Sequence, residues 1–173
     1  MNTIERPSAA EFAPYYADYV STVPDGNIVQ LLAQQKVTLR ARTAIITPAQ
    51  ETYRYAPGKW TVREMFGHLT DVERVFGYRA MCISRGDTAS LPGFDENTYV
   101  ETANFNSRPL QALLDELVAV RDGNLLMMHT FDAEAWARMG VANNVPVSVR
   151  ALAFIMAGHI NHHLEVLRTR YAL

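Results

Sequence analysis

The sequence predicts an all-α protein, a four-helix bundle that forms a single domain over residues 1–173. Four segments repeat apolar residues at helical spacing, whereas the alternating pattern of half-buried strands is almost absent. Stretches rich in Pro, Gly, Asn and Asp separate these segments. The length of 173 residues suits one hydrophobic core, and a composition that is 49% hydrophobic and 20% charged is typical of a globular protein.

The first two predicted helices have clear boundaries. The first follows the turn signal at residues 24–27 and ends near Thr47-Pro48, because proline cannot continue a helix. The second has the strongest start signal in the chain, since Thr61 can cap it and Glu64 can return the hydrogen bond three residues later. The apolar face of the first helix carries Ile28, Leu31, Leu32, Leu39 and Ile46.

The third and fourth predicted helices begin after proline. The third follows Ser107-Arg108-Pro109, with the proline near its first turn, and is expected to fray near His129. The fourth follows Pro146-Val147-Ser148, with Ser148 as its cap, and ends with the chain. Their apolar faces are Leu110, Leu113, Leu114, Leu117 and Val120 in the third, and Leu152, Ile155, Met156, Val166 and Leu167 in the fourth.

The connections also carry information. Residues 85–107 form a long polar stretch between the second and third helices, which predicts a crossover that lets these helices run parallel. The insert at residues 131–144 predicts a short helix capped by Asp132. Aromatic residues near the N-terminus are expected to cover the bundle, namely Phe12, Tyr15, Tyr16 and Tyr19.

Charge and composition exclude several kinds of partner. Sixteen Lys and Arg against eighteen Asp and Glu leave a net charge of −2, and no basic run is long enough to follow nucleic-acid phosphates. The single cysteine, Cys82, cannot form an internal disulfide, in agreement with a reducing compartment. No secretory signal and no membrane span of about 18 apolar residues is found. We therefore expect a cytoplasmic protein that binds neither nucleic acid nor membrane.

Histidines provide the main candidate site. His159 and His163 are four residues apart, so they lie about 40° apart on one face of the fourth helix, and this face is the apolar one. Buried imidazoles need partners, and two histidines at this spacing can bind one divalent ion. Two ligands are too few, and His68, on the core flank of the second helix, is the predicted third.

An interpretation of these histidines without a metal ion remains open. A lone His68 would most often be a hydrogen-bonded core histidine. Gly67 and Gly158 precede His68 and His159, and a glycine that costs a helix about 1 kcal/mol is typical of close backbone approach. Helix packing alone could explain those glycines, although the three histidines together favour a metal.

Charged residues near these histidines are candidates for further roles. Asp71, one turn after His68, is the preferred orienting group or catalytic base, ahead of Glu64 and Glu165, and its alternative is a solvated surface carboxylate. Arg79, three turns beyond His68, is predicted to bind an anionic substrate group, although surface salt bridges are the commoner use of such an arginine.

Three neutral imidazoles would leave an ion with an open position, the arrangement of a catalytic site. Such an ion lowers the pKa of a bound water toward about 7 or ionises a bound thiol. Nitrogen ligands suit several metals, and we favour zinc or nickel, with iron, cobalt and manganese as alternatives.

Several separated motifs occur in order along the chain. They are Tyr53-Arg54-Tyr55-Ala56-Pro57-Gly58-Lys59-Trp60-Thr61, Gly67-His68, Leu91-Pro92-Gly93-Phe94, Gly158-His159 and His162-His163. With these motifs the chain resembles the DinB family, damage-inducible four-helix bundles related to the YfiT metal-dependent hydrolases. In that family a histidine on helix two and an HxxxH pair on helix four bind a divalent metal, which assigns the metal here to His68, His159 and His163.

The resemblance also implies an unusual bundle topology with a parallel helix pair, and a homodimer. It further implies a metal-dependent hydrolase or a thiol transferase of the bacillithiol or mycothiol kind, acting on a small molecule. Two alternatives remain: a metal-binding protein without catalysis, and a stress-related interaction module in which the histidines have no role.

Overall fold

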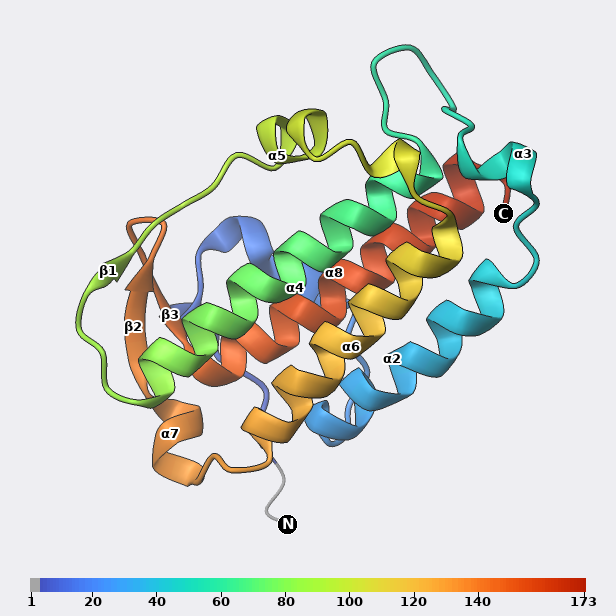
Figure 1. Ribbon diagram of the computed structural model, residues 1–173. Helices are drawn as coiled ribbons and strands as arrows, with labels where there is room; N and C mark the ends of the chain where they lie inside the picture. The colour runs from blue at the N-terminus through green and yellow to red at the C-terminus, as the bar shows by residue number, and fades with distance from the viewer. Residues whose placement is uncertain (1–3) are drawn as a thin grey trace.

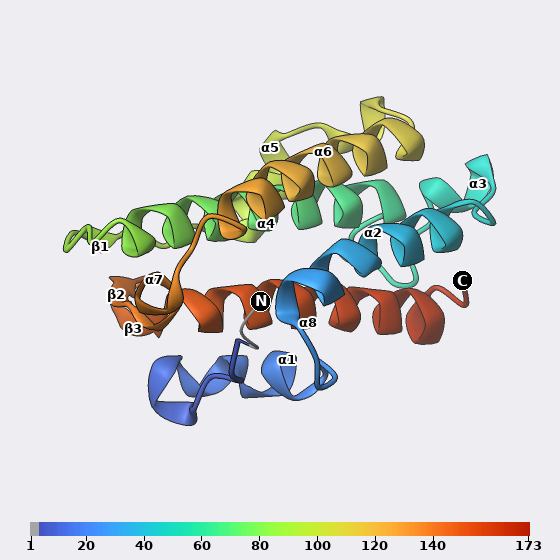
Figure 2. The ribbon, with the colours of Figure 1, turned by 90° about the horizontal axis from the view of Figure 1, so that it is seen from below.

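The computed structural model describes residues 4–173 and contains a bundle of four long helices (Figure 1). Helices α4 and α6 run side by side in one direction, and α2 and α8 run in the opposite direction (Figures 1 and 2). Both α4 and α2 contact α6 and α8. The predicted four-helix bundle and its parallel second and third helices are confirmed. The bundle helices are α2 (Ile28–Thr43), α4 (Val62–Ser84), α6 (Leu110–Met128) and α8 (Val149–Arg170).

Shorter elements surround the bundle. Figure 2 shows α1 lying along α8, on the side away from α4 and α6. Within residues 4–173 no helix is long and apolar enough to cross a membrane. The shorter elements are η1 (Ala9–Glu11), η2 (Pro14–Tyr16), α1 (Ala17–Ser21), α3 (Pro48–Glu51), β1 (Ser90–Leu91), α5 (Glu96–Thr102), η3 (Phe105–Ser107), α7 (Ala133–Ala137), β2 (Met139–Ala142) and β3 (Val145–Ser148).

Local hydrogen bonds fix where the helices begin. The Thr61 hydroxyl accepts from the Glu64 amide at 3.0 Å, and the Glu64 carboxylate accepts from the Thr61 amide at 2.7 Å, which completes the predicted capping box. Ser148 and Asp132 cap α8 and α7 as predicted. One boundary differs, because α2 ends at Thr43 and a separate short helix, α3, begins at Pro48.

A small three-stranded sheet adds to the helical fold at one end of the bundle. Strand β1 pairs in parallel with β2, and β2 pairs with β3 in an antiparallel hairpin. The hairpin turn places Asn143 and Asn144 at φ angles of 52° and 62°, a left-handed conformation that asparagine tolerates. The sheet ties the crossover to the segment that precedes α8.

A layer of polar side chains crosses the bundle between two apolar clusters. On α4, Leu69 belongs to one cluster and Val72 to the other. On α8, Ile160 belongs to the cluster of Leu69, and Ala157 belongs to the cluster of Val72. His68 and His159 lie at or beside these changes of cluster. The buried Gln35, Glu73 and Arg121 belong to the same layer, on α2, α4 and α6.

Candidate metal centre

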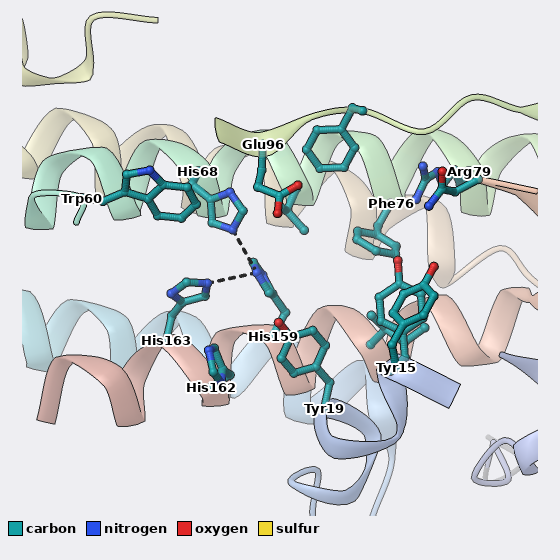
Figure 3. Close-up of a pocket in the computed structure, with 15 residues that line it drawn as sticks. Tyr15, Tyr19, Trp60, His68, Phe76, Arg79, Glu96, His159, His162 and His163 are labelled. Atoms are coloured by element: carbon teal, nitrogen blue, oxygen red, sulfur yellow. Dashed lines mark hydrogen bonds between the residues drawn. The ribbon is translucent and has the colours of Figure 1, made fainter. Parts of the chain in front are cut away.

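Three imidazoles from two helices meet near the middle of the bundle. His68 comes from α4, and His159 and His163 come from successive turns of α8 (Figure 3). The Nε2 atom of His159 lies 3.1 Å from the Nε2 atom of His68 and 3.1 Å from that of His163. The three residues are 6%, 7% and 9% exposed, respectively. The fold thus directs one nitrogen of each ring toward a shared point.

Burial keeps these rings neutral. Desolvation lowers the pKa of His68 to about 4. Desolvation, followed by the charges of neighbouring histidines, holds the pKa of His159 and His163 well below the ordinary value of 6.5. A neutral imidazole has one N–H and one lone pair, so the Nε2 atom of His159 can satisfy only one of its two neighbours with a linear hydrogen bond.

The donor set fits a divalent ion. Two nitrogens that each lie about 2.0–2.1 Å from one ion are separated by about 2.9–3.4 Å for ordinary ligand angles, and the 3.1 Å spacings fall in this range. All three candidate ligand atoms lie within 4.8 Å of one another. Neutral imidazole is a common ligand of zinc, nickel, iron and cobalt. His68, His159 and His163 are therefore suitably placed and of the right chemistry to hold such an ion.

Packing around the rings sets their orientation. The Trp60 ring lies 4.6 Å from the His68 ring, between centroids, and the edge of Tyr19 meets His159 at 5.5 Å. The Nδ1 atom of His163 is buried and has no hydrogen-bond partner among residues 4–173. Aromatic rings thus pack against His68 and His159, and no hydrogen bond at Nδ1 fixes the ring of His163.

Glycines let neighbouring elements approach the helices that carry the clustered histidines. A Cβ built at Gly67 would lie 2.3 Å from the ring of Phe105. A Cβ built at Gly158 would lie 2.0 Å from the carbonyl oxygen of Tyr19. Both glycines therefore serve close packing, as the reading without metal expects, but this role accompanies the histidine cluster and does not replace it.

The imidazoles form one end of a cavity of about 400 Å³. Its opposite end carries Arg79, and Glu96 of α5 lies between the two ends (Figure 3). The cavity wall combines polar and apolar side chains. The lining residues are Tyr15, Tyr16, Tyr19, Trp60, His68, Val72, Phe76, Arg79, Phe94, Glu96, Asn143, Ile155, His159, His162 and His163.

Of the predicted charged residues, the structure brings Arg79 to this cavity and leaves Asp71 outside it. Asp71 faces α6 and lies 3.5 Å from Arg74, which also binds Glu116 at 2.5 Å. Desolvation raises the pKa of Asp71, and Arg74 offsets part of that rise. A catalytic role for Asp71 stays a prediction that this placement does not support.

The other acidic candidates are engaged elsewhere. Glu64 caps α4 and binds Arg54, and the exposed Glu165 pairs with Arg168. The carboxylate that does line the cavity is Glu96, which sequence reasoning missed. Glu96 is the first residue of α5 and follows the capping residue Asp95. This cap, at the start of a short helix within the crossover, is the only feature of the sequence that could have drawn attention to Glu96.

Among the solved structures that match this chain, two illustrate the shared fold. YfiT from Bacillus subtilis, described as a probable metal-dependent hydrolase with an unusual four-helix bundle topology, matches with a TM-score of 0.71 at 18% identity, over 91% of this chain and 93% of that chain. A mycothiol-dependent maleylpyruvate isomerase matches with a TM-score of 0.66 at 11% identity, over 83% of this chain and 60% of that chain.

Sequence comparison gives the family. No curated protein matches the chain significantly. A family model described as the DinB superfamily matches residues 30–167, a range that includes all four bundle helices almost completely and all three clustered histidines. The chain therefore belongs to the DinB superfamily.

Proposed function

We propose that this protein is a divalent-metal-dependent enzyme that acts on a small molecule, as a hydrolase or as a thiol transferase. The observation that carries the proposal is the convergence of three buried imidazole nitrogens at one end of an open cavity. A bound ion would supply a Lewis acid and lower the pKa of a bound water or thiol. Zinc or nickel is the favoured ion, and iron, cobalt and manganese are the alternatives.

Residues of this chain would bind the ion, position its ligands and transfer a proton. His68, His159 and His163 hold the ion, and Trp60 keeps the His68 ring in place. Glu96 is the one carboxylate among the described lining residues, and we assign to it the base that accepts a proton from water or from a thiol. Glu96 thus takes the role that the sequence predicted for Asp71.

The structural neighbours support this class of function and leave both reactions open. One is described as a probable metal-dependent hydrolase and the other as a mycothiol-dependent isomerase. A low-molecular-weight thiol is therefore a candidate co-substrate here. A homodimer and a cytoplasmic location complete the proposal, and light scattering and cell fractionation test them.

Metal analysis tests the centre itself. Inductively coupled plasma mass spectrometry on untagged protein should give near one equivalent of metal, and His68→Ala, His159→Ala and His163→Ala should each lose it. His162→Ala is the matched control, because His162 is exposed beside the cluster and is expected to leave the metal content unchanged. Wild-type protein that takes up no zinc, nickel, cobalt or anaerobic iron would contradict the proposal.

Turnover tests the reaction. A panel of esters, amides and electrophiles with and without low-molecular-weight thiols should identify a substrate. Glu96→Gln should then lower kcat by about 10²–10⁴-fold, the usual contribution of a general base, while the metal content stays at the wild-type level. A metal-loaded protein that turns over nothing in the panel would favour a non-catalytic metal-binding protein.

A further inference from the structure

Arg79 is buried in the cavity wall, and no carboxylate of residues 4–173 pairs with it. Arg79 and Arg121 are 3% and 2% exposed. Arg121 donates to both oxygens of Glu73, at 2.8 Å and 2.7 Å. Arg79 has no carboxylate oxygen within 4.0 Å among residues 4–173. A buried charge without a partner is costly, so the arginine at the cavity calls for an anion that comes from outside the chain.

The contacts of Arg79 hold its guanidinium in place but leave its charge unbalanced. One Nη2 hydrogen bond goes to the Pro92 carbonyl at 2.8 Å, and the guanidinium carbon lies 5.3 Å from the centre of the Phe76 ring. Burial raises the pKa of the Tyr16 phenol, and nearby Arg79 offsets part of that rise. A protonated phenol and a guanidinium therefore stand together at this end of the cavity.

We infer that this end of the cavity binds a carboxylate of the substrate. One guanidinium beside a neutral phenol balances a single negative charge, and its planar fork matches a carboxylate. A dianionic phosphate would exceed this charge and would also face the Glu96 carboxylate, which lines the same cavity.

The length and the lining of the cavity also indicate the shape of the substrate beyond its carboxylate. Arg79 stands eleven residues after His68 on α4, a rise of about 16 Å, and helical side chains lean back toward the N-terminus. Val72, Phe76 and Ile155 give the cavity apolar walls. The substrate class is thus a small, elongated monocarboxylate with an apolar middle. The placement of its reacting bond at the histidines rests on the proposed function.

Calorimetric titration of the purified protein with 3-phenylpropanoate, with its neutral amide and with phenyl phosphate tests this subsite. The carboxylate should bind at least about tenfold more tightly than the other two probes, and Arg79→Gln should weaken it about tenfold or more, as for a hydrogen bond to a charged group. Arg42→Gln, at an exposed arginine of α2, should change nothing. Equal binding of the amide, tighter binding of the phosphate, or unchanged binding in Arg79→Gln would overturn the inference.

Two further variants keep the outcomes separate. A carboxylate could bind a metal ion instead of Arg79, so the titration is repeated with His159→Ala, in which carboxylate binding should persist. Loss of binding in His159→Ala with retention in Arg79→Gln overturns the subsite and leaves the proposed metal centre standing. Persistent binding in a protein that takes up no metal keeps the subsite and removes the metal centre.

If Arg79→Gln does not fold, Arg79→Lys replaces it and should bind the carboxylate several-fold more weakly. Wild-type affinity in Arg79→Lys would overturn the subsite.

Discussion

The carbonyl oxygen of Tyr19 occupies the space beside Gly158 in which any other residue would place its Cβ atom, 2.0 Å away. Helix α1 therefore rests directly on α8, one residue before His159. The ring of Tyr19 also meets the rings of His159 and His162, at 5.5 Å and 5.3 Å between centroids. The segment before the bundle is thus fitted to the helix that carries two of the three clustered histidines.

Gly158→Ala is expected to destabilise the protein by about 1–3 kcal/mol, because the new methyl group must displace the Tyr19 backbone. This loss should outweigh the gain of about 1 kcal/mol in helix propensity that alanine brings. Urea denaturation measures the difference. Gly123→Ala is the control, since a Cβ there meets nothing within 4 Å and the change should stabilise α6. Stabilisation by both substitutions would contradict the close fit.

Arg121→Leu is expected to lower the free energy of unfolding by about 3–5 kcal/mol, because Glu73 stays buried without its partner. Arg79→Leu removes an equally buried arginine but leaves no carboxylate unpaired, so its loss should be clearly smaller. Urea denaturation of both variants and of the Glu73→Leu/Arg121→Leu pair measures these values. The double variant should recover most of the loss, and equal losses in the two single variants would refute this account.

Glu11 makes the docking of the N-terminal segment depend on pH. Hydrogen bonds from Arg150, at 2.6 Å and 2.7 Å, are the main cause that lowers the pKa of Glu11 to about 2 from its ordinary value of 4.5. Because the folded-state pKa is the lower one, the stabilisation is complete above pH 4.5 and is lost as pH falls toward 2. It amounts to about 3 kcal/mol at most.

Glu11→Gln should therefore be less stable than wild type at pH 7, and the difference should vanish near pH 2, as followed by denaturation at a series of pH values. Comparison of the two proteins at each pH cancels the contribution of the buried histidines. Glu165→Gln, at an exposed ion pair with Arg168, should show no measurable difference from wild type. A constant gap between wild type and Glu11→Gln at every pH would rule out the linkage.

Metal binding should stabilise the fold. An ion present at about 100 times its Kd adds about 2.7 kcal/mol to the free energy of unfolding if it binds the folded state alone. Thermal unfolding should accordingly shift upward with added zinc or nickel, return on chelation, and show no shift in His159→Ala. An unchanged Tm in wild type at saturating metal would contradict metal binding by the folded state.

Local signals explain how much of this fold could be predicted. The caps Thr61, Asp132 and Ser148 depend on hydrogen bonds that span only three residues, so the sequence contains them in full. The sheet depends instead on β1 meeting β2 across the chain, with Ser90 opposite Val141. Strands of two to four residues are too short to display an alternating pattern, which is why the sequence did not predict them.

The candidate site divides in the same way. His159 and His163 share a face because of helix geometry alone, and α4 meets α8 as a bundle requires, so His68 joins them. Asp71 is also on α4, but three residues after His68 it is turned about 60° away, and Arg74 holds it toward α6. Glu96 reaches the cavity only through the path of the crossover, which no helical periodicity describes.

The crossover is fixed at two points, where β1 joins β2 and where Phe105 packs on Gly67. Between these points the chain supplies Phe94 and Glu96 to the cavity from outside the four helices. Mutations, insertions or deletions in this span would reshape the cavity without moving any of the clustered histidines. In evolution, the cavity can therefore diverge by change in one surface segment while the cluster of three histidines is inherited intact.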